Sequence, residues 1–210
     1  MINRFEDVDV LCNWTQFGVI VMNRKESNPA DVIAAATAEI ALKAQNLFLT
    51  RQRWCSEAVF VVLNQGLRGG LPAETAVRLA SGLGEGLGGR GCICGALNGG
   101  VLALGLFLGT SSPGWHNGKR VRTASSQLHD FFRQSFGATC CRVLTKEIPG
   151  ASKEHCRQCA LRTGRTAEEA ARIILRKRPE LVKEIDWTYL NQTDSRVGAA
   201  MKVLSGALRR

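Results

Sequence analysis

The chain has few aromatic residues and no long uninterrupted apolar segment. Aromatic residues make up 6% of its 210 residues, so a core must consist mainly of Ala, Leu, Ile and Val, which favours packed helices. The longest apolar run, Ala96 to Leu108, is interrupted by Asn98 and is shorter than the ~20 residues of a membrane-spanning helix. No segment has the basic, apolar and small-residue order of a secretory signal. We therefore expect no membrane span and a location in the reducing cytoplasm.

The chain also lacks a recognisable nucleic-acid-binding motif, although its net charge is +10 and its basic residues are concentrated at 172–178 and 209–210. Its Lys and Arg residues are spread along helical segments, and no helix-turn-helix, zinc finger or aromatic RNA-binding signature is present. This distribution predicts a solvated basic surface and no nucleic-acid partner. The same surface would suit an acidic electron-transfer protein. The sequence does not decide whether the protein forms a homodimer.

Helix signals follow one another along the middle of the chain, and no useful stretch alternates as a strand does. Asn28 is a good N-cap and Pro29 suits the first helical turn. The pattern predicts helices over about 29–50, 54–66, 72–83, 94–108, 124–136 and 152–177, and a short turn capped by Thr139. We predict an all-α multi-helix bundle with a glycine-rich loop-helix segment at its centre. The expected units are an N-terminal arm over 1–26, a redox domain over 27–178 and a helical extension over 179–210.

Eight cysteines are spread over this pattern, more than a cytosolic core needs. Cys55, Cys94, Cys141 and Cys156 fall in or near the first turn of a predicted helix, where unpaired N–H groups favour a thiolate. Cationic residues lie beside these positions in the sequence: Arg51, Arg53, Arg90, Arg142, Lys153 and Arg157. If these helix starts converge, they form an electropositive pocket suited to a thiolate–metal centre.

The remaining cysteines differ in how much they indicate. The C-x-C at Cys92 and Cys94 is moderately informative, whereas the H-C-x-x-C that ends at Cys159 is weak by itself. Adjacent Cys140 and Cys141 cannot easily bind one centre together, so one of them is expected to serve packing, as is Cys12. Additional or alternative ligands are Cys92, Cys140 and Cys156. The site residues expected to allow close packing are Gly91, Gly95 and Gly99.

Two other cofactors are not expected. A C-x-x-C-H haem attachment motif is absent. The glycine-rich stretch from Gly82 follows a helix rather than a strand, so it fails the context that a nucleotide-binding loop requires. We therefore expect no haem and no nucleotide.

Four sequence blocks resemble the C_GCAxxG_C_C family of redox-active proteins. They are WCSEAV from Trp54, SGLGEGLGGRGCICGALNGGVLALGL from Ser81, CRVL from Cys141, and Cys159 followed by TAEEAARII, within a similarity that runs from about residue 22 to 175. The resemblance implies that the family cysteines are Cys55, Cys94, Cys141 and Cys159. A related domain is similar to part of the split-Soret cytochromes, which carry haem and a non-haem iron centre. Only the iron part of that relation is implied here.

Three functions are compatible with these residues. The first is a small redox protein that binds an iron–sulfur cluster through the four family cysteines, for electron transfer or redox sensing. The second is a metal-free thiol–disulfide oxidoreductase. The third is a zinc-stabilised helical module that binds a partner. The resemblance supplies no specific reaction.

Overall fold

The computed structural model describes residues 28–112, 114–150, 152–192 and 194–195, so the predicted arm over 1–26 lies outside it. The described part is helical and contains no strand. Its elements are α1 (Pro29–Leu49), α2 (Cys55–Gly66), α3 (Ala73–Ser81), α4 (Gly84–Leu87), α5 (Gly95–Leu108), α6 (Lys119–Phe136), α7 (Cys141–Leu144), α8 (Lys153–Lys177), the 3-10 helix η1 (Pro179–Glu184) and α9 (Trp187–Leu190). The all-α prediction is confirmed.

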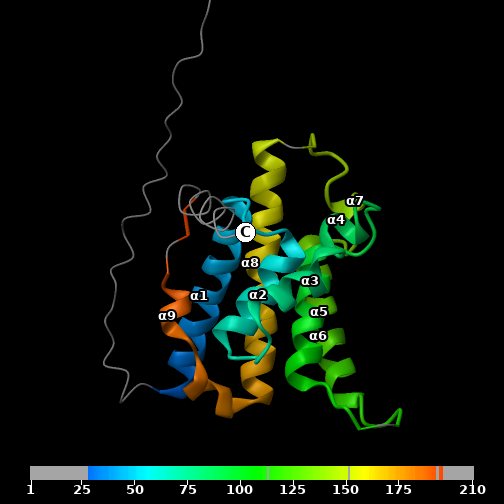
Figure 1. The fold of residues 1–210 in the computed structure, drawn as a ribbon. Helices are drawn as coiled ribbons and strands as arrows, with labels where there is room; N and C mark the ends of the chain where they lie inside the picture. The colour runs from blue at the N-terminus through cyan, green and yellow to red at the C-terminus, as the bar shows by residue number, and fades with distance from the viewer. Residues whose placement is uncertain (1–27, 113, 151, 193, 196–210) are drawn as a thin grey trace, which may run out of the picture.

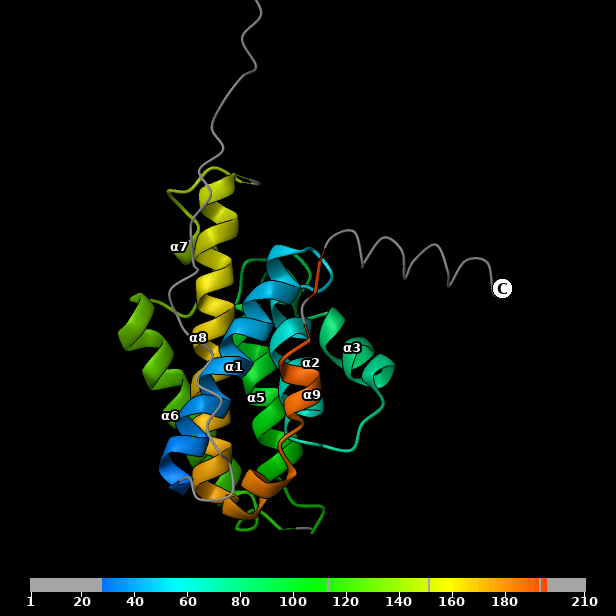
Figure 2. The ribbon, with the colours of Figure 1, turned by 90° about the vertical axis from the view of Figure 1, so that its left-hand side faces the viewer.

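Helix α8 is the axis of the bundle, and α1, α2, α5 and α6 pack around it (Figure 1). The helix begins at the Ser152 N-cap, whose side chain accepts a hydrogen bond from the His155 N–H at 3.0 Å. Small buried side chains on α8, such as Ala167 and Ala171, let its neighbours approach closely. The view turned by 90° shows α1 lying along α8, with α3 on the outside of the bundle (Figure 2).

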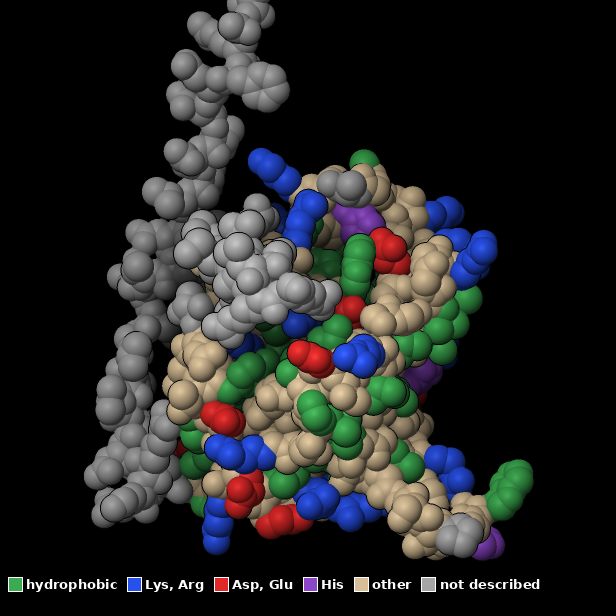
Figure 3. All heavy atoms as spheres, viewed as in Figure 1, with side chains coloured by type: hydrophobic (Ala, Val, Ile, Leu, Met, Phe, Trp, Pro, Cys, Tyr) green, Lys and Arg blue, Asp and Glu red, His purple; other side chains and the backbone are tan. Residues whose placement is uncertain are grey.

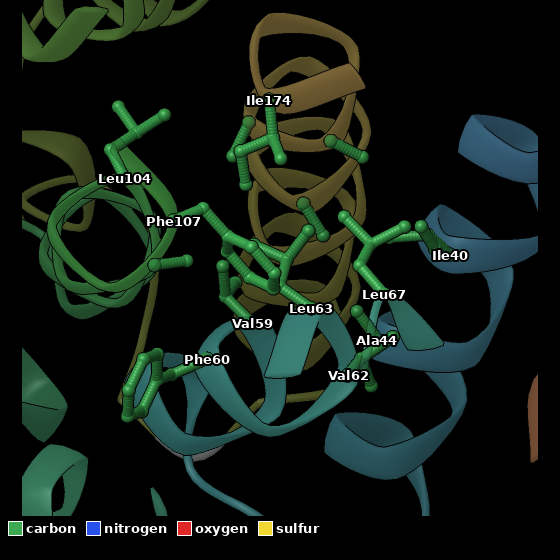
Figure 4. Close-up of a cluster of buried hydrophobic side chains, with 14 of the residues drawn as sticks. Ile40, Ala44, Val59, Phe60, Val62, Leu63, Leu67, Leu104, Phe107 and Ile174 are labelled. Carbon is green, nitrogen blue, oxygen red and sulfur yellow. The ribbon is translucent and has the colours of Figure 1, made fainter. Parts of the chain in front are cut away.

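The main core lies where α2, α5 and α8 meet. Val59 and Leu63 of α2 point toward Phe107 of α5 and Ile174 of α8 (Figure 4). Fully burying one such side chain contributes about 1.5–3 kcal/mol. This contact fixes the positions of the helices that carry most of the family cysteines.

Helix α1 buries Ala36, Ile40, Ala44 and Leu47 and packs against both α8 and α2. Among the described residues it is the one helix long and apolar enough to cross a membrane by length and composition. A core helix of this length passes the same test. The packing of α1 against other helices accounts for its buried apolar residues.

The C-terminal part of the described chain returns to the bundle. The Lys43 ammonium of α1 lies 2.5 Å from the Asp194 carboxylate and donates to the Gln192 carbonyl oxygen at 2.7 Å. The Asp186 N–H donates to the Gly66 carbonyl oxygen at 2.9 Å. These bonds fix η1 and α9 against α1 and α2.

Three local predictions are corrected. Helix α6 begins at Lys119 rather than after Thr123, because Val121 packs against the core and extends the helix by a turn. The short helix α4, within the glycine-rich loop, was not expected. Cys140 rather than Thr139 is the N-cap of α7, since the Thr139 carbonyl oxygen instead accepts from the Cys94 N–H at 2.8 Å.

Replacing Gly99 by Ala should destabilise the protein by about 1–3 kcal/mol, the usual range for overpacking. The added methyl group would collide with the backbone carbonyl oxygen of Ser56 in α2, which cannot move aside as a side chain can. Gly105→Ala is the matched control on the same helix, because nothing lies within 4 Å of its added Cβ. That variant should gain about 0.5–1 kcal/mol. Urea denaturation followed by circular dichroism measures both changes, and equal effects of the two substitutions would contradict the close helix contact.

Candidate thiol site

The glycine-rich segment after α3 folds back on itself and places Cys92 and Cys94 beside α7. The Cys92 N–H donates to the Gly86 carbonyl oxygen at 3.2 Å, which closes the loop. Gly86 has a φ of +70°, and a Cβ there would lie 2.8 Å from both the Cys141 Cβ and the Cys92 nitrogen. Only glycine meets both demands at this position. The loop geometry therefore brings the C-x-C motif against the start of α7.

A short antiparallel bridge between Ile93 and Cys140 fastens these two segments together. The Cys94 N–H donates to the Thr139 carbonyl oxygen at 2.8 Å, and the Cys141 N–H donates to the Cys92 carbonyl oxygen at 2.6 Å. Each of the two cysteines thus has its backbone position fixed by a bond to the opposite segment. This contact joins parts of the chain that are far apart in sequence.

Cys55 is the first residue of α2 and lies against the first residue of α5. The Glu57 carboxylate accepts a hydrogen bond from the Trp54 N–H at 3.1 Å and so caps α2. A Cβ at Gly95 would lie 2.5 Å from the Cys55 sulfur. The lack of a side chain at Gly95 is what leaves room for the Cys55 thiol next to Cys94.

Cys159 comes to the same place from α8. The pKa of Cys159 is raised to about 11, mainly by burial, and nearby Cys55 and Cys141 thiolates would add to that rise. Burial also raises the pKa of Cys94 to about 12, again with contributions from Cys55 and Cys141. Cys55 thus contributes to the raised pKa of Cys94, Cys141 and Cys159, although these residues come from distant parts of the chain.

The expectation that helix starts favour thiolates is corrected by these pKa shifts. Burial raises the pKa of Cys55 and of Cys141 as well. Backbone N–H groups act in the expected direction: that of Glu85 lowers the pKa of Cys55, and those of Ala96 and Leu97 lower that of Cys94. Desolvation of the thiolate outweighs these donors. The metal-free site therefore holds protonated thiols near neutral pH.

The cation that acts on the thiols was missed in the sequence. Arg162 lowers the pKa of Cys141 and Cys159 against the larger effect of burial. It follows Cys159 by three positions on α8, so both residues lie on one face of that helix. This spacing was the available signal. The cations that the sequence suggested are exposed or half-buried, and they are Arg51, Arg53, Arg90, Arg142, Lys153 and Arg157.

The other cysteines lie around this site in different ways. Cys92 is exposed. The Cys140 thiol is half-buried and donates to the Gly91 carbonyl oxygen at 2.9 Å. Cys156 is half-buried in the first turn of α8. Cys12 lies outside the described residues. A Cβ at Gly91 would lie 2.8 Å from the Arg142 Cβ, and Gly99 lies against α2.

The face of the molecule drawn in Figure 3 carries both basic and acidic side chains. Figure 3 shows Lys and Arg side chains scattered over one face of the molecule rather than gathered into one patch. In the part of the chain that the structure describes, no group of three or more His, Cys, Asp or Glu side chains is placed to hold a single metal ion. The four sulfurs thus lie close enough to interact but not as the ligand shell of one ion.

The reduced, metal-free protein should lose stability as the pH rises above about 8.5, the pKa of a thiol in an unfolded chain. Above that pH the unfolded state loses the Cys94 proton while the folded state keeps it up to a pH of about 12. The free energy of unfolding should then fall by up to about 1.4 kcal/mol per pH unit from this thiol.

Urea denaturation at several pH values, with reductant and a chelator present, measures this slope. Cys94→Ala should show a smaller slope than the wild type. Cys92→Ala removes an exposed thiol from the same segment and should keep the wild-type slope. Equal slopes in Cys94→Ala and wild type would show that Cys94 ionises alike in both states.

Comparison with known proteins adds the family to this geometry. No curated protein and no solved structure matches the chain. One family model does match, described as "Putative redox-active protein (C_GCAxxG_C_C)", over residues 54–173. The matched region is more than half of the chain and contains Cys55, Cys94, Cys141, Cys159 and the glycine-rich loop between them. The chain therefore belongs to the C_GCAxxG_C_C family of redox-active proteins.

Proposed function

We propose that this redox protein binds an iron–sulfur cluster through Cys55, Cys94, Cys141 and Cys159, for electron transfer or redox sensing. The observation that carries the proposal is the meeting of these four thiols from α2, the start of α5, α7 and α8. Four cysteine sulfurs are the usual ligand set of such clusters. A reducing compartment, the proposed location, would keep the thiols available for iron.

The residues present suit a cluster in three respects. All four donors are cysteines, and Cys94 is buried with 6% exposure. Gly86 and Gly95 leave space beside the Cys141 and Cys55 side chains. The backbone N–H group of Glu85 lowers the pKa of Cys55, and those of Ala96 and Leu97 lower the pKa of Cys94. Hydrogen bonds from the backbone to ligand sulfurs are among the features that set the potential of a cluster.

The placement of the described metal-binding side chains does not favour a single zinc ion. Zinc in a structural site is held by four ligands at about 2.0–2.3 Å from one centre. The described residues offer no such group. A cluster distributes its cysteine ligands over several iron atoms, so its ligands stand further apart. The zinc-stabilised module is the less favoured function for this reason.

When bound, the cluster would supply one-electron chemistry. The chain would supply the rest. The four cysteines would fix the position of the centre, and burial of Cys94 would keep water from it. The donors at the start of α5 would stabilise negative charge on the Cys94 sulfur.

A metal-free dithiol function is the second candidate, and one observation favours it. Cys92 is exposed and stands two positions from Cys94, so one thiol is accessible to a substrate disulfide. In that reaction two protein thiols would be oxidised to a disulfide while the substrate disulfide is reduced to two thiols. The raised pKa of Cys94 and of Cys159 acts against these two residues as the attacking thiolate.

Anaerobic purification or reconstitution with iron and sulfide, followed by metal and sulfide analysis and visible absorption, tests the proposal. The wild type should contain iron and sulfide and show sulfur-to-iron charge-transfer absorption. Serine at Cys55, Cys94, Cys141 or Cys159 should reduce the iron content several-fold, because each substitution removes a ligand. Cys92→Ser and Cys156→Ser are the matched controls, and they should keep the wild-type spectrum.

Three outcomes would contradict the proposal. A wild-type protein without iron or charge-transfer absorption after anaerobic reconstitution would favour the dithiol function. Equal iron loss in the control variants would show that the ligands are not the four family cysteines. Bound zinc without sulfide would favour the helical partner-binding module.

A further inference from the structure

Helix α8 carries a buried cation that no acidic side chain neutralises. Arg162 is 7% exposed. Its Nη2 donates to the Leu144 carbonyl oxygen at 3.1 Å, whereas its Nε and Nη1 are buried and have no hydrogen-bond acceptor. Among the described residues, no carboxylate forms an ion pair with it. Two nitrogens of a permanently charged group, Nε and Nη1, therefore donate no hydrogen bond inside the protein.

Burial of the Arg162 charge opposes folding unless another group supplies hydrogen-bond acceptors and negative charge. Burying a charge without a partner opposes folding by several kcal/mol, and an arginine cannot escape that cost by losing its proton. The bond to Leu144 uses only one of the five N–H donors. A purely structural role for Arg162 would explain that bond but not the burial of the other donors.

The guanidinium is close to the thiol site. Its charge lowers the pKa of Cys141 and Cys159. The Cys159 thiol does not, however, satisfy Nε or Nη1 in hydrogen-bonding geometry. An anion at the cysteines would therefore supply both the missing hydrogen-bond acceptor and the missing negative charge.

We propose that Arg162 forms an anion site within the thiol cluster, and that its ligand is an anionic sulfur of the iron-bound centre. That sulfur is either a cysteine thiolate bound to iron or a sulfide of the cluster. The inference rests on the proposed function for the source of the sulfur. In the metal-free protein Arg162 is a buried charge without a partner. In the loaded protein it is a positioning residue that binds the anionic sulfur.

Two variants and one control separate this role from a structural one. Arg162→Met removes the charge and keeps an unbranched apolar side chain, while Arg162→Lys keeps the charge but loses the Nε and Nη1 donors. Arg157→Met is the control, because Arg157 lies on the same helix with its side chain 81% exposed. All three are compared with the wild type both reduced and metal-free and after anaerobic loading with iron and sulfide.

In the metal-free protein, thermal unfolding should place Arg162→Met at the wild-type melting temperature or above it, because an uncompensated buried charge has been removed. In the loaded protein, Arg162→Met should lose iron to a chelator at least tenfold faster than the wild type. Outer partners of metal ligands have effects of this size. The rate of iron loss from Arg162→Lys should lie between those of Arg162→Met and the wild type. Arg157→Met should match the wild type in both measurements.

Two results would overturn the inference. A metal-free Arg162→Met that melts below the wild type would assign Arg162 a structural role through Leu144. A loaded Arg162→Met that keeps its iron as long as the wild type would show that the guanidinium does not bind the centre. If the wild type takes up no iron, the proposed function fails. The iron-bound sulfur ligand of Arg162 then fails with it. The metal-free comparison still decides whether Arg162 is an uncompensated buried charge: Arg162→Met melts at or above the wild type if it is, and below the wild type if it is not.

Discussion

The thiol site depends on how closely helix α5 can approach helix α2. Gly99 lies against the backbone of Ser56, and one turn earlier Gly95 lies against the sulfur of Cys55. At both positions the partner is part of an adjoining helix start, so even a methyl group would separate the helices. Cys94 caps α5 directly before this contact. The approach of two backbones therefore decides whether Cys55 and Cys94 share one site.

Burial and charge oppose each other at this site. The helix starts and Arg162 favour negative sulfur, whereas desolvation favours neutral thiols and is the larger influence on the four family cysteines. Such a balance suits a centre whose cysteine sulfurs become anionic only when a positively charged group binds to them. A metal does this, because it deprotonates the thiols that bind it. The free protein and the loaded protein would then differ mainly in charge, with little need for a change of fold.

Local signals predicted most of the helices, and tertiary contacts decided what was missed. Asn28 and Pro29 indicated the start of α1, and Cys55 falls at the start of α2 as expected. The helix α4 could not be expected, because Glu85 and Leu87 adopt left-handed φ values of 53° and 58° that their residue types disfavour.

The direction of the thiol pKa shifts escaped the sequence for a related reason. A helix start can be seen in the local sequence, but the burial of Cys94 depends on elements from distant parts of the chain. Arg162 was missed because its spacing of three positions from Cys159 does not by itself show that this face of α8 is buried near Cys141. Family similarity selected the four cysteines, whereas the cation beside them needed the packed structure.

The order of these residues along the chain has a consequence during synthesis. The site draws on residues from Cys55 in α2 to Arg162 in α8, and α8 also holds the bundle together. A nascent chain that has not yet released α8 from the ribosome cannot assemble the site, even though Cys94 and Cys141 have already emerged. Incorporation of any cofactor must therefore follow translation of nearly the whole family region. Until then a reducing environment would be needed to protect the emerging thiols from oxidation.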